Sequence, residues 1–499
     1  MSYETKTKTT SLKRELRNSF STKWVTNSAV VAVAAFAAMM PAPEARAQDD
    51  EIHLTIWPGR YTPTRVMATA GGGTKSSAIQ GIDPIIAAYE ELHPNVTIEV
   101  IGQSINADTR RWMITQLTGG VAPDIMWYLG DWAVEDFRKK WLVPINEYLE
   151  RPNHYIEAGQ PGSERWRDLF FPQIEVWKAP NGELYVVLAD QIQVGIYYNK
   201  DLFAKAGVDG VPKTWEEMMV AAEKINATGG AYGFAATGNN LHQLTWVSGW
   251  LTNFFYHPEI GKHDKDGDGV LDKVEMATAV KEGTYSYSDE RNRARLEELK
   301  RFAGYWQPGA LGTDMGAAVR LFVTGRAGML IVGTWMLPTI REDENRDFDF
   351  GIFYLPVVDS ATSELIPDGV LPTNKSAGYG SFQYAVTNSA VESGEVEAAI
   401  DFLMFATQPD QLNQMILEGG IALPGVHGAP PNPDLEDFKE SVTLARAPYQ
   451  EDDSMFDSVF AEKFLVVTSP YLSGDQSLDE TVDRLNAEMD QAADRVLGN

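Results

Sequence analysis

The 499-residue sequence contains no cysteine. This absence excludes thiol catalysis, disulfide bonds, cysteine-ligated zinc or iron–sulfur centres, and a lipid anchor on an N-terminal cysteine. Basic residues are also scarce, since 42 lysines and arginines stand against 70 aspartates and glutamates and give a formal net charge of −28. This balance argues against nucleic acid as a partner, because binding to phosphate backbones requires a basic face.

Long hydrophobic runs are missing as well. The run at residues 29–40 follows a lysine- and arginine-rich start and has about 12 residues, whereas a membrane-spanning helix needs about 20. Pro41 and Pro43 end this run, and Ala45-Arg46-Ala47 has the small-x-small pattern of a signal peptidase site. We predict that residues 1–47 are a signal peptide, that the mature chain is periplasmic, and that it has no stable membrane insertion. The alternative is a short membrane anchor.

Hydrophobic residues make up 44% of the chain and aromatic residues 11%, enough to form the cores of two or three domains. Alternating apolar residues predict strands at residues 52–56 and 96–100, and Asp83-Pro84 predicts the start of a helix over residues 85–92. Strand, helix and strand in this order are typical of a right-handed parallel unit. The sequence therefore predicts an α/β fold.

A second α/β segment follows. A hydrophobic strand is expected from residue 185, and Thr214 with Glu217 predicts a capping box for a helix over residues 215–225. Residues 291–302 are predicted to be helical, and residues 329–332 to form a strand. Ligands of such folds bind in the crevice at the strand ends. No short fixed period is present, which excludes solenoids and propellers.

Several stretches carry a family resemblance. The most specific is DQIQVGIYYNKDLFAK at residues 190–205, which departs from the family signature only at Leu188, where a small residue or proline is usual. The others are APDI (122–125), PKTWEE (212–217), FVTGRAGMLIVGTW (322–335) and AAIDFLMFAT (398–407). In these stretches the sequence resembles the extracellular solute-binding proteins of carbohydrate-uptake ABC transporters, the family that includes the maltodextrin-binding protein.

The resemblance implies a two-lobed periplasmic binding protein fold with discontinuous lobes. Lobe 1 is expected to comprise residues 48–189 and 357–407, and lobe 2 residues 190–356 and 408–499, with three hinge crossings near Asp190, Pro356 and Thr407. A carbohydrate would be held between the lobes, and ligand contacts from both lobes would shift the population toward a closed form. The expected partner is the membrane permease of an ABC importer, and the protein itself is expected to be a monomer.

Sugar sites combine aromatic planes with polar groups that bind hydroxyls. The first-strand loop and the resemblance place nine candidates at such a site: Trp57, Arg60, Tyr128, Asp131, Asp190, Gln191, Trp246, Trp335 and Tyr379. Some have structural alternatives. Trp246 has Trp250 one turn later and fits core packing equally well, Asp131 fits an exposed loop, and Arg60 fits simple solvation. Trp215 belongs to the capping motif, and we expect it to be structural.

Residues 264–275 match the twelve-residue EF-hand loop, in which oxygen ligands at fixed positions surround Ca²⁺ and a glycine makes the turn. The predicted metal ligands are Asp264, Asp266, Asp268, the Val270 carbonyl, Asp272 through water, and Glu275. Pro258 and Gly261 precede the loop and argue against a full helix-loop-helix. We therefore predict a structural Ca²⁺ cofactor in lobe 2, and no sensor opening. The alternative is an acidic turn without metal.

We predict that the protein is not an enzyme but captures a neutral di- or oligosaccharide or a polyol. One alternative is a binder of acidic, uronate-type oligosaccharides, which would use Arg60, Arg65, Arg110 and Arg111 as carboxylate partners. The neutral ligand is preferred because aromatic candidates outnumber clustered basic ones. The other alternative, a secreted glycoside hydrolase, needs two carboxylates that flank a bond. No nucleophile elbow, zinc-protease motif or phosphate loop is present.

Overall fold

The structure is a computed structural model that describes residues 51–66, 80–105, 108–238, 241–450, 452 and 454–498. The predicted signal peptide, residues 1–47, lies outside the described residues. All described residues belong to one compact unit, Glu51–Asn499. Within the described ranges, no helix combines the length and the apolar character that crossing a bilayer requires.

The first sheet has the strand order β2-β1-β3-β10-β4. Its strands are β1 (Ile52–Trp57), β2 (Val96–Val100), β3 (Ile125–Trp127), β4 (Val187–Leu188) and β10 (Gln383–Val386). Strand β1 pairs in parallel with β2 and β3, as the predicted strand-helix-strand unit requires. Strand β10 comes from much later in the chain and pairs antiparallel with both β3 and β4.

The second sheet has the order β7-β8-β6-β9. Its strands are β6 (Val194–Asn199), β7 (Tyr232–Ala235), β8 (Ala327–Gly333) and β9 (Phe350–Phe353). All seven residues of β8 are buried, because this central strand has helices on its faces and paired strands on both edges. We call the first sheet with its packed helices the first lobe, and the second sheet with its packed helices the second lobe.

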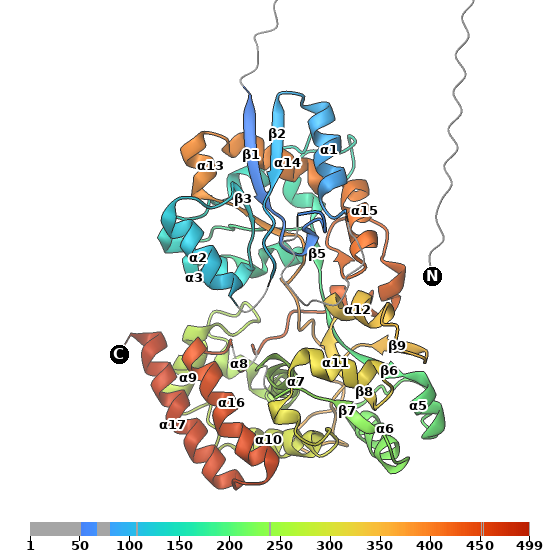
Figure 1. The fold of residues 1–499 in the computed structure, drawn as a ribbon. Coiled ribbons are helices and arrows are strands. Elements are labelled where there is room, and N and C mark those ends of the chain that lie inside the picture. Colours follow the sequence, from blue (N-terminus) through green and yellow to red (C-terminus); the bar gives the residue numbers. More distant parts are fainter. Residues whose placement is uncertain are drawn as a thin grey trace, which may run out of the picture. The chain divides into compact units, whose positions relative to one another are not determined.

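Helices cover both sheets (Figure 1). Those of the first lobe are α1 (Asp83–Leu92), α2 (Thr109–Gly119), α3 (Gly130–Asp136), α4 (Asn146–Leu149), α13 (Asn388–Ser393), α14 (Val396–Ala406) and α15 (Pro409–Gly419). Those of the second lobe are α5 (Lys200–Lys205), α6 (Trp215–Ala227), α7 (Leu241–Phe255), α8 (Ile260–His263), α9 (Lys273–Lys281), α10 (Glu290–Ala303), α11 (Met315–Val323), α12 (Leu337–Arg341), α16 (Ser458–Ser473) and α17 (Leu478–Leu497).

The chain passes more than once between the two hydrophobic cores. Strand β5 (Asp190–Gln191) lies at the first passage and pairs antiparallel with β11 (Leu423–Pro424). Core packing changes lobe again between Val370 and Phe382, and the last change comes after Val426, which still packs in the core of the first lobe. These changes lie later in the chain than the crossings expected near Pro356 and Thr407.

Local signals explain where several helices begin. The Thr214 hydroxyl accepts from the Glu217 amide, and the Glu217 carboxylate accepts in turn from the Thr214 amide, so the predicted capping box is formed at α6. Helix α1 differs from its prediction. Its N-cap is Ile82, and the Asp83 carboxylate does not cap the helix but accepts from the Arg65 guanidinium at 2.5 and 2.6 Å.

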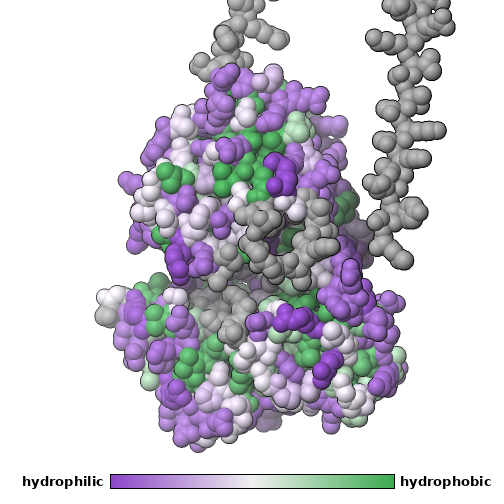
Figure 2. Space-filling view, in the orientation of Figure 1, coloured by the Kyte–Doolittle hydropathy of each residue, from purple (hydrophilic) through white to green (hydrophobic). Residues whose placement is uncertain are grey.

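The face shown in Figure 2 is mainly hydrophilic, with hydrophobic residues in separate patches. This appearance agrees with the surplus of acidic residues, most of which are spread over the surface. The net charge therefore contributes to solubility and to the long-range field, and does not define the fold.

Candidate functional site

Asp190 lies at the first passage between the lobes and is fully buried. Its Oδ2 accepts from the Tyr61 hydroxyl at 2.5 Å, and its Oδ1 accepts from the amides of Ser381 and Phe382 at 2.6 and 2.8 Å. Burial raises the pKa of this carboxyl to about 6, although the three donors oppose the shift. Asp190 therefore ties the loop after β1 to the segment before β10, and both its oxygens are occupied by protein donors.

Arg60 and Trp335 form a contact between the two lobes. Arg60 belongs to η1 (Gly59–Tyr61), and its Cζ lies 5.4 Å from the centre of the Trp335 ring. Burial lowers the pKa of Arg60 to about 10, and its Nε is buried without a hydrogen-bond partner among the described residues. Trp335 follows β8 in η7 (Thr334–Met336), and a Cβ at Gly333 would lie 1.8 Å from its ring, so only glycine allows this approach.

Trp246 from α7 packs edge-on against Trp335, with ring centres 5.8 Å apart. It is only 7% exposed, so most of its surface is covered by protein, as the core-packing alternative expected. Trp335 is half-buried and has a larger free surface. Both rings belong to the second lobe. The Trp335 ring is accessible, and the buried Trp246 ring packs against it.

Tyr379 lies in a glycine-flanked turn between the lobes, as the sequence indicated. Gly378 has φ +86°, and a Cβ there would lie 2.5 Å from Val176 and 2.6 Å from the indole nitrogen of Trp177, so a larger residue does not fit. The Trp177 indole donates to the Gly378 carbonyl at 2.6 Å, and its ring packs edge-on against Tyr379 with centres 5.2 Å apart. The turn therefore brings the two rings together.

Arg446 completes this group of residues. Its Cζ lies 5.2 Å from the centre of the Trp177 ring, and its Nη1 donates to the Val176 carbonyl at 3.3 Å. Burial lowers its pKa. Sequence reasoning missed both Trp177 and Arg446, because Trp177 lies in η4 (Pro172–Trp177) with no motif around it and Arg446 lies in an irregular segment.

The contacts join these side chains into one strip. Trp335 and Tyr379 both pack against the small cluster of Ile192, Ile421 and Ala422 at the passage between lobes. We define the aromatic strip by its contact order: Arg60, Trp335, the Ile192 cluster, Tyr379, Trp177 and Arg446. It draws residues from both lobes, which is the arrangement that a ligand held between lobes requires.

Buried amides lie beside the strip. The Gln193 amide donates to Asn374 Oδ1 at 3.2 Å, and the Asn374 amide donates to Gln191 Oε1 at 3.3 Å. Gln191 Nε2 and Gln193 Oε1 have no hydrogen-bond partner within the described part of the chain. Buried polar groups are normally paired, so these two atoms are an unsatisfied donor and an unsatisfied acceptor in the described structure.

Three predicted site residues lie away from the strip or at its margin. Trp57 is fully buried, its indole donates to the Gln103 carbonyl at 2.9 Å, and its ring packs on Trp112 and Trp127. It therefore has no free face, and the prediction that it stacks on a ligand does not match its placement. Tyr128 is also buried. Its hydroxyl donates to Asp136 and accepts from Arg110 at 3.1 Å, and burial raises its pKa.

Asp131 lies near the Trp177 end of the strip, because α3 packs against η4. Its Oδ1 accepts from the amide of Trp132 at 2.9 Å, and burial raises its pKa to about 6. The carboxylate keeps its second oxygen for another donor. This geometry is compatible with the predicted role in binding hydroxyls.

The arginines proposed for an acidic ligand separate into two groups. Arg65 pairs with Asp83 at 2.5 Å, Arg110 with Asp136 at 2.7 Å, and Arg111 with Asp108 at 3.0 Å. Their charges are used within the first lobe. For Arg60, no carboxylate of the described residues lies within the 4.0 Å of an ion pair.

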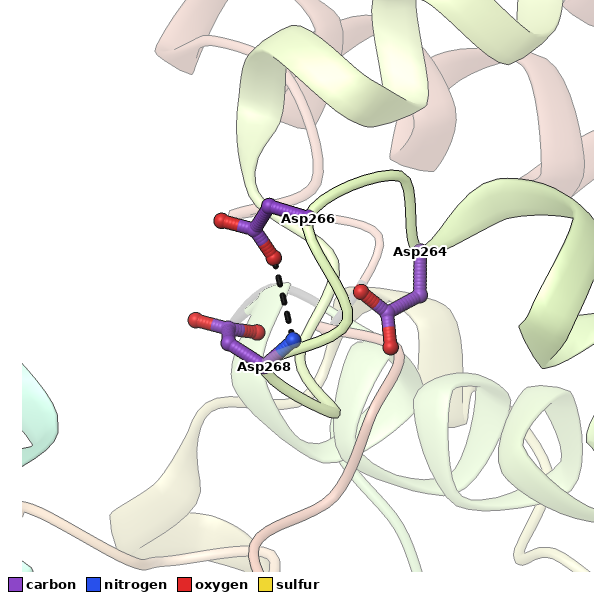
Figure 3. A group of neighbouring side chains, drawn as sticks. All are labelled: Asp264, Asp266 and Asp268. Atoms are coloured by element: carbon purple, nitrogen blue, oxygen red, sulfur yellow. Dashed lines mark hydrogen bonds between the residues drawn. The ribbon is translucent and has the colours of Figure 1, made fainter.

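The predicted metal loop brings three of its six ligands together. The carboxylates of Asp264, Asp266 and Asp268 each place an oxygen within 4.8 Å of the others (Figure 3). Asp266 Oδ1 accepts from the Asp268 amide at 3.0 Å, and Asp264 accepts from the amides of Gly267 and Gly269 at 2.8 and 3.0 Å. These bonds fix the carboxylates in the loop.

The last two predicted ligands are engaged differently. Asp272 and Glu275 form a capping box at the start of α9. Glu275 Oε1 accepts from the Lys265 amide at 2.6 Å and its Oε2 from the Asp272 amide at 3.0 Å, so it lies against the loop backbone. Only the short α8 and the η5 turn (His257–Glu259) precede the loop, which agrees with the expectation that no full helix-loop-helix forms.

The loop also touches other parts of the protein. The Leu271 amide donates to the Pro448 carbonyl at 2.9 Å, two residues from Arg446. Lys273 Nζ lies 3.3 Å from Glu135 Oε1 of α3, which is an ion pair between the lobes. The loop is therefore adjacent to the Arg446 end of the strip.

Comparison with known proteins extends these observations. Residues 74–412 match the model of the family described as bacterial extracellular solute-binding protein. A Brucella abortus (strain 2308) protein whose name proposes a binding role is 24% identical over 278 residues, and the chain spans 59% of that relative's length and 54% of its own. YcjN of Escherichia coli (strain K12), whose name proposes a periplasmic-binding role in an ABC transporter, is 24% identical over 349 residues and 69% of each chain.

A solved structure shares the fold. The chain superposes on a chitin oligosaccharide binding protein with a TM-score of 0.61 and 18% identity, over 83% of this chain and 95% of the other. This similarity agrees with the α/β, two-lobed arrangement that the sequence predicted.

Proposed function

Since the chain belongs to the family of bacterial extracellular solute-binding proteins, we propose that it captures a di- or oligosaccharide or a polyol between its two lobes and delivers it to an ABC permease. Members of this family are binding proteins, and we propose that this chain likewise binds its ligand without chemical change. We further propose that it acts as a periplasmic monomer.

The aromatic strip is the observation that carries this proposal. Its rings come from both lobes, and half-buried aromatic faces are suited to the apolar C–H faces of sugars. The unpaired amide atoms of Gln191 and Gln193 lie beside it and can bind hydroxyl groups. Such a combination of rings and polar groups favours a carbohydrate over an apolar ligand.

The test is a thermal-shift screen against neutral and acidic oligosaccharides, followed by calorimetry with the best ligand. A ligand that binds only the folded state raises the free energy of unfolding by about 2.7 kcal/mol at one hundred times its Kd. The ligand must be recovered intact after incubation. Release of reducing ends would support the hydrolase alternative, and a screen in which no carbohydrate stabilises the protein would refute the proposal.

Trp335→Ala tests the strip directly. We expect at least tenfold weaker binding, about 1.4 kcal/mol, with an unchanged far-UV spectrum. Trp141→Ala is the matched control, because this half-buried tryptophan contacts Lys139 and lies outside the strip. If the two variants bind the ligand with equal affinity, Trp335 is not part of the binding site.

We also propose that residues 264–275 hold a structural calcium ion. The convergence of three aspartates in a loop with EF-hand spacing supports this function. Calorimetry on chelator-treated protein should detect calcium uptake, and chelator should lower the melting temperature. Asp343→Asn serves as a control, since Asp343 also accepts from a nearby amide in an exposed turn but belongs to no such cluster among the described residues. Absence of calcium uptake in the unmodified protein would contradict the proposal.

A further inference from the structure

Two arginines of the strip differ from the other buried or half-buried arginines that the structure describes. Eight of these arginines pair with a carboxylate within 4.0 Å: Arg110, Arg151, Arg167, Arg291, Arg293, Arg295, Arg301 and Arg341. Arg346 has no such pair but donates to three backbone carbonyls. The other two arginines of this set, Arg60 and Arg446, have no carboxylate partner among the described residues. The only hydrogen bond described for them is the one from Arg446 Nη1 to the Val176 carbonyl.

Among the buried and half-buried arginines of the described residues, a guanidinium without a carboxylate partner is unusual. Acidic residues outnumber basic ones by 70 to 42, so carboxylates are available almost everywhere on the surface. A partly buried guanidinium without a carboxylate partner or full hydrogen bonding retains an uncompensated charge, which is costly. An unpaired guanidinium at a binding site indicates that an anionic group of the ligand is its partner.

Both guanidiniums lie over an aromatic ring of the strip and keep donors for such a partner. Arg60 lies over Trp335 and Arg446 over Trp177, at 5.4 and 5.2 Å. A guanidinium has five N–H donors, and a contact with an aromatic ring leaves donors for a further partner. These donors match the two oxygens of a carboxylate or a phosphate, which accept paired hydrogen bonds in the guanidinium plane.

The nearby carboxylates offset the charge of the two guanidiniums only in part, because neither forms a direct ion pair with them in the described structure. Asp190 is the acidic group closest in effect to Arg60, but its oxygens already accept from Tyr61, Ser381 and Phe382. Asp268 acts on Arg446 from the metal loop, and its Oδ1 accepts from the Val270 amide at 2.8 Å. Neither carboxylate forms an ion pair with the arginine within 4.0 Å in the described residues.

We propose that the carbohydrate ligand is anionic, with sugar rings along the aromatic strip and carboxylate or phosphate groups paired with Arg446 and Arg60. This inference rests on the proposed carbohydrate-binding function and narrows its ligand class. It departs from the neutral ligand that the sequence favoured, because three of the four arginines considered there are engaged elsewhere and Arg446 was not among them.

Calorimetry with matched ligands tests the proposal. The probes are a neutral disaccharide, the corresponding disaccharide of uronic acids, a sugar phosphate and inorganic phosphate. We expect an anionic sugar to bind at least tenfold more tightly than its neutral counterpart, and the uronate and phosphate arms identify the source of the charge. Equal or tighter binding of the neutral sugar overturns the inference but leaves the proposed function intact. Binding of no sugar in any arm refutes the proposed function itself.

Arginine variants supply the second test. Arg446→Gln and Arg60→Gln should each weaken binding of the anionic sugar at least tenfold more than they weaken binding of the neutral sugar. Arg65→Gln is the matched control, because this exposed arginine pairs with Asp83 within the first lobe. Arg446→Lys keeps the charge but loses the planar fork, so it should recover only part of the affinity. Equal losses for neutral and anionic sugars in both glutamine variants would show that the arginines only support the strip, and would overturn the inference.

Discussion

Asp190 is fully buried, and its carboxylate accepts hydrogen bonds from three donors. Burial disfavours the charged form, whereas the donors favour it, and the balance raises the pKa to about 6. The protonation state of this carboxyl group therefore changes near pH 6. Because Asp190 connects Tyr61 with Ser381 and Phe382, its protonation state affects the stability of the passage between the lobes.

Asp190→Asn tests this pKa. A folded-state pKa above the unfolded value of about 3.9 means that the folded protein binds more protons between pH 4 and 6, so its free energy of unfolding falls as the pH rises through this window. The loss is at most about 3 kcal/mol, at 1.36 kcal/mol per pKa unit. Urea unfolding at pH 4 and pH 7 should show a larger stability difference between wild type and Asp190→Asn at pH 4. A difference that is equal at both pH values would place the pKa near its ordinary value.

The sequence identified the residue types of the site better than their surroundings. Trp335, Tyr379 and Arg60 could be proposed because a strand end, a glycine-flanked turn and a loop after a strand have local signatures. Trp57 has the same kind of position, but its ring is covered by Trp112 and Trp127, which come from other elements. Arg446 and Trp177 carry no local signal, since only the tertiary fold brings them together.

Helix α9 and the metal loop share residues. Asp272 and Glu275 cap the helix in the structure, and the same two residues are expected ligands of calcium. Asp268 belongs to the loop alone and takes no part in the cap. Substitutions at these positions therefore separate metal binding from helix stability.

We expect Asp268→Ala to weaken calcium binding at least tenfold while leaving the chelator-treated protein about as stable as wild type. Glu275→Ala should weaken calcium binding and also destabilise the metal-free protein by about 1 kcal/mol, because it removes the acceptor of the Lys265 and Asp272 amides. Calcium calorimetry and urea unfolding in chelator measure the two effects. If both variants behave alike in chelator, the cap makes no separate contribution.

Helices and strands that have a local sequence pattern could be predicted. The pairing of strands that lie far apart in the chain could not. Alternation and Asp83-Pro84 gave β1, α1 and β2 to within a few residues, and Thr214 with Glu217 gave the start of α6. Strand β10 pairs with β3 and β4, which lie far earlier in the chain, and no local pattern specifies those partners. For the same reason, α15 packs in the core of the first lobe although the sequence placed it after the last crossing.

Two contacts join the lobes. Arg60 lies over the Trp335 ring, and Lys273 pairs with Glu135 at 3.3 Å. The exposed ion pair contributes about 0–1 kcal/mol, whereas the proposed ligand would contact both lobes at once and so favour a closed form. We therefore expect saturating ligand to reduce the radius of gyration in X-ray scattering. Glu135→Gln should give the same ligand-bound curve with less than about fivefold change in affinity, and an unchanged radius in the wild type would contradict closure.

The net charge of −28 opposes the approach of the anionic ligand that Arg60 and Arg446 are proposed to bind. The Debye length falls from about 30 Å at 0.01 M salt to about 8 Å at 0.15 M, so salt screens the long-range repulsion before it weakens partly buried pairs. The association rate constant of an acidic sugar, followed by tryptophan fluorescence in stopped flow, should therefore rise severalfold over this range. A neutral sugar provides the control and should show little change. An association rate that falls with salt for the acidic sugar would mean that the positive field of the two arginines already dominates at long range.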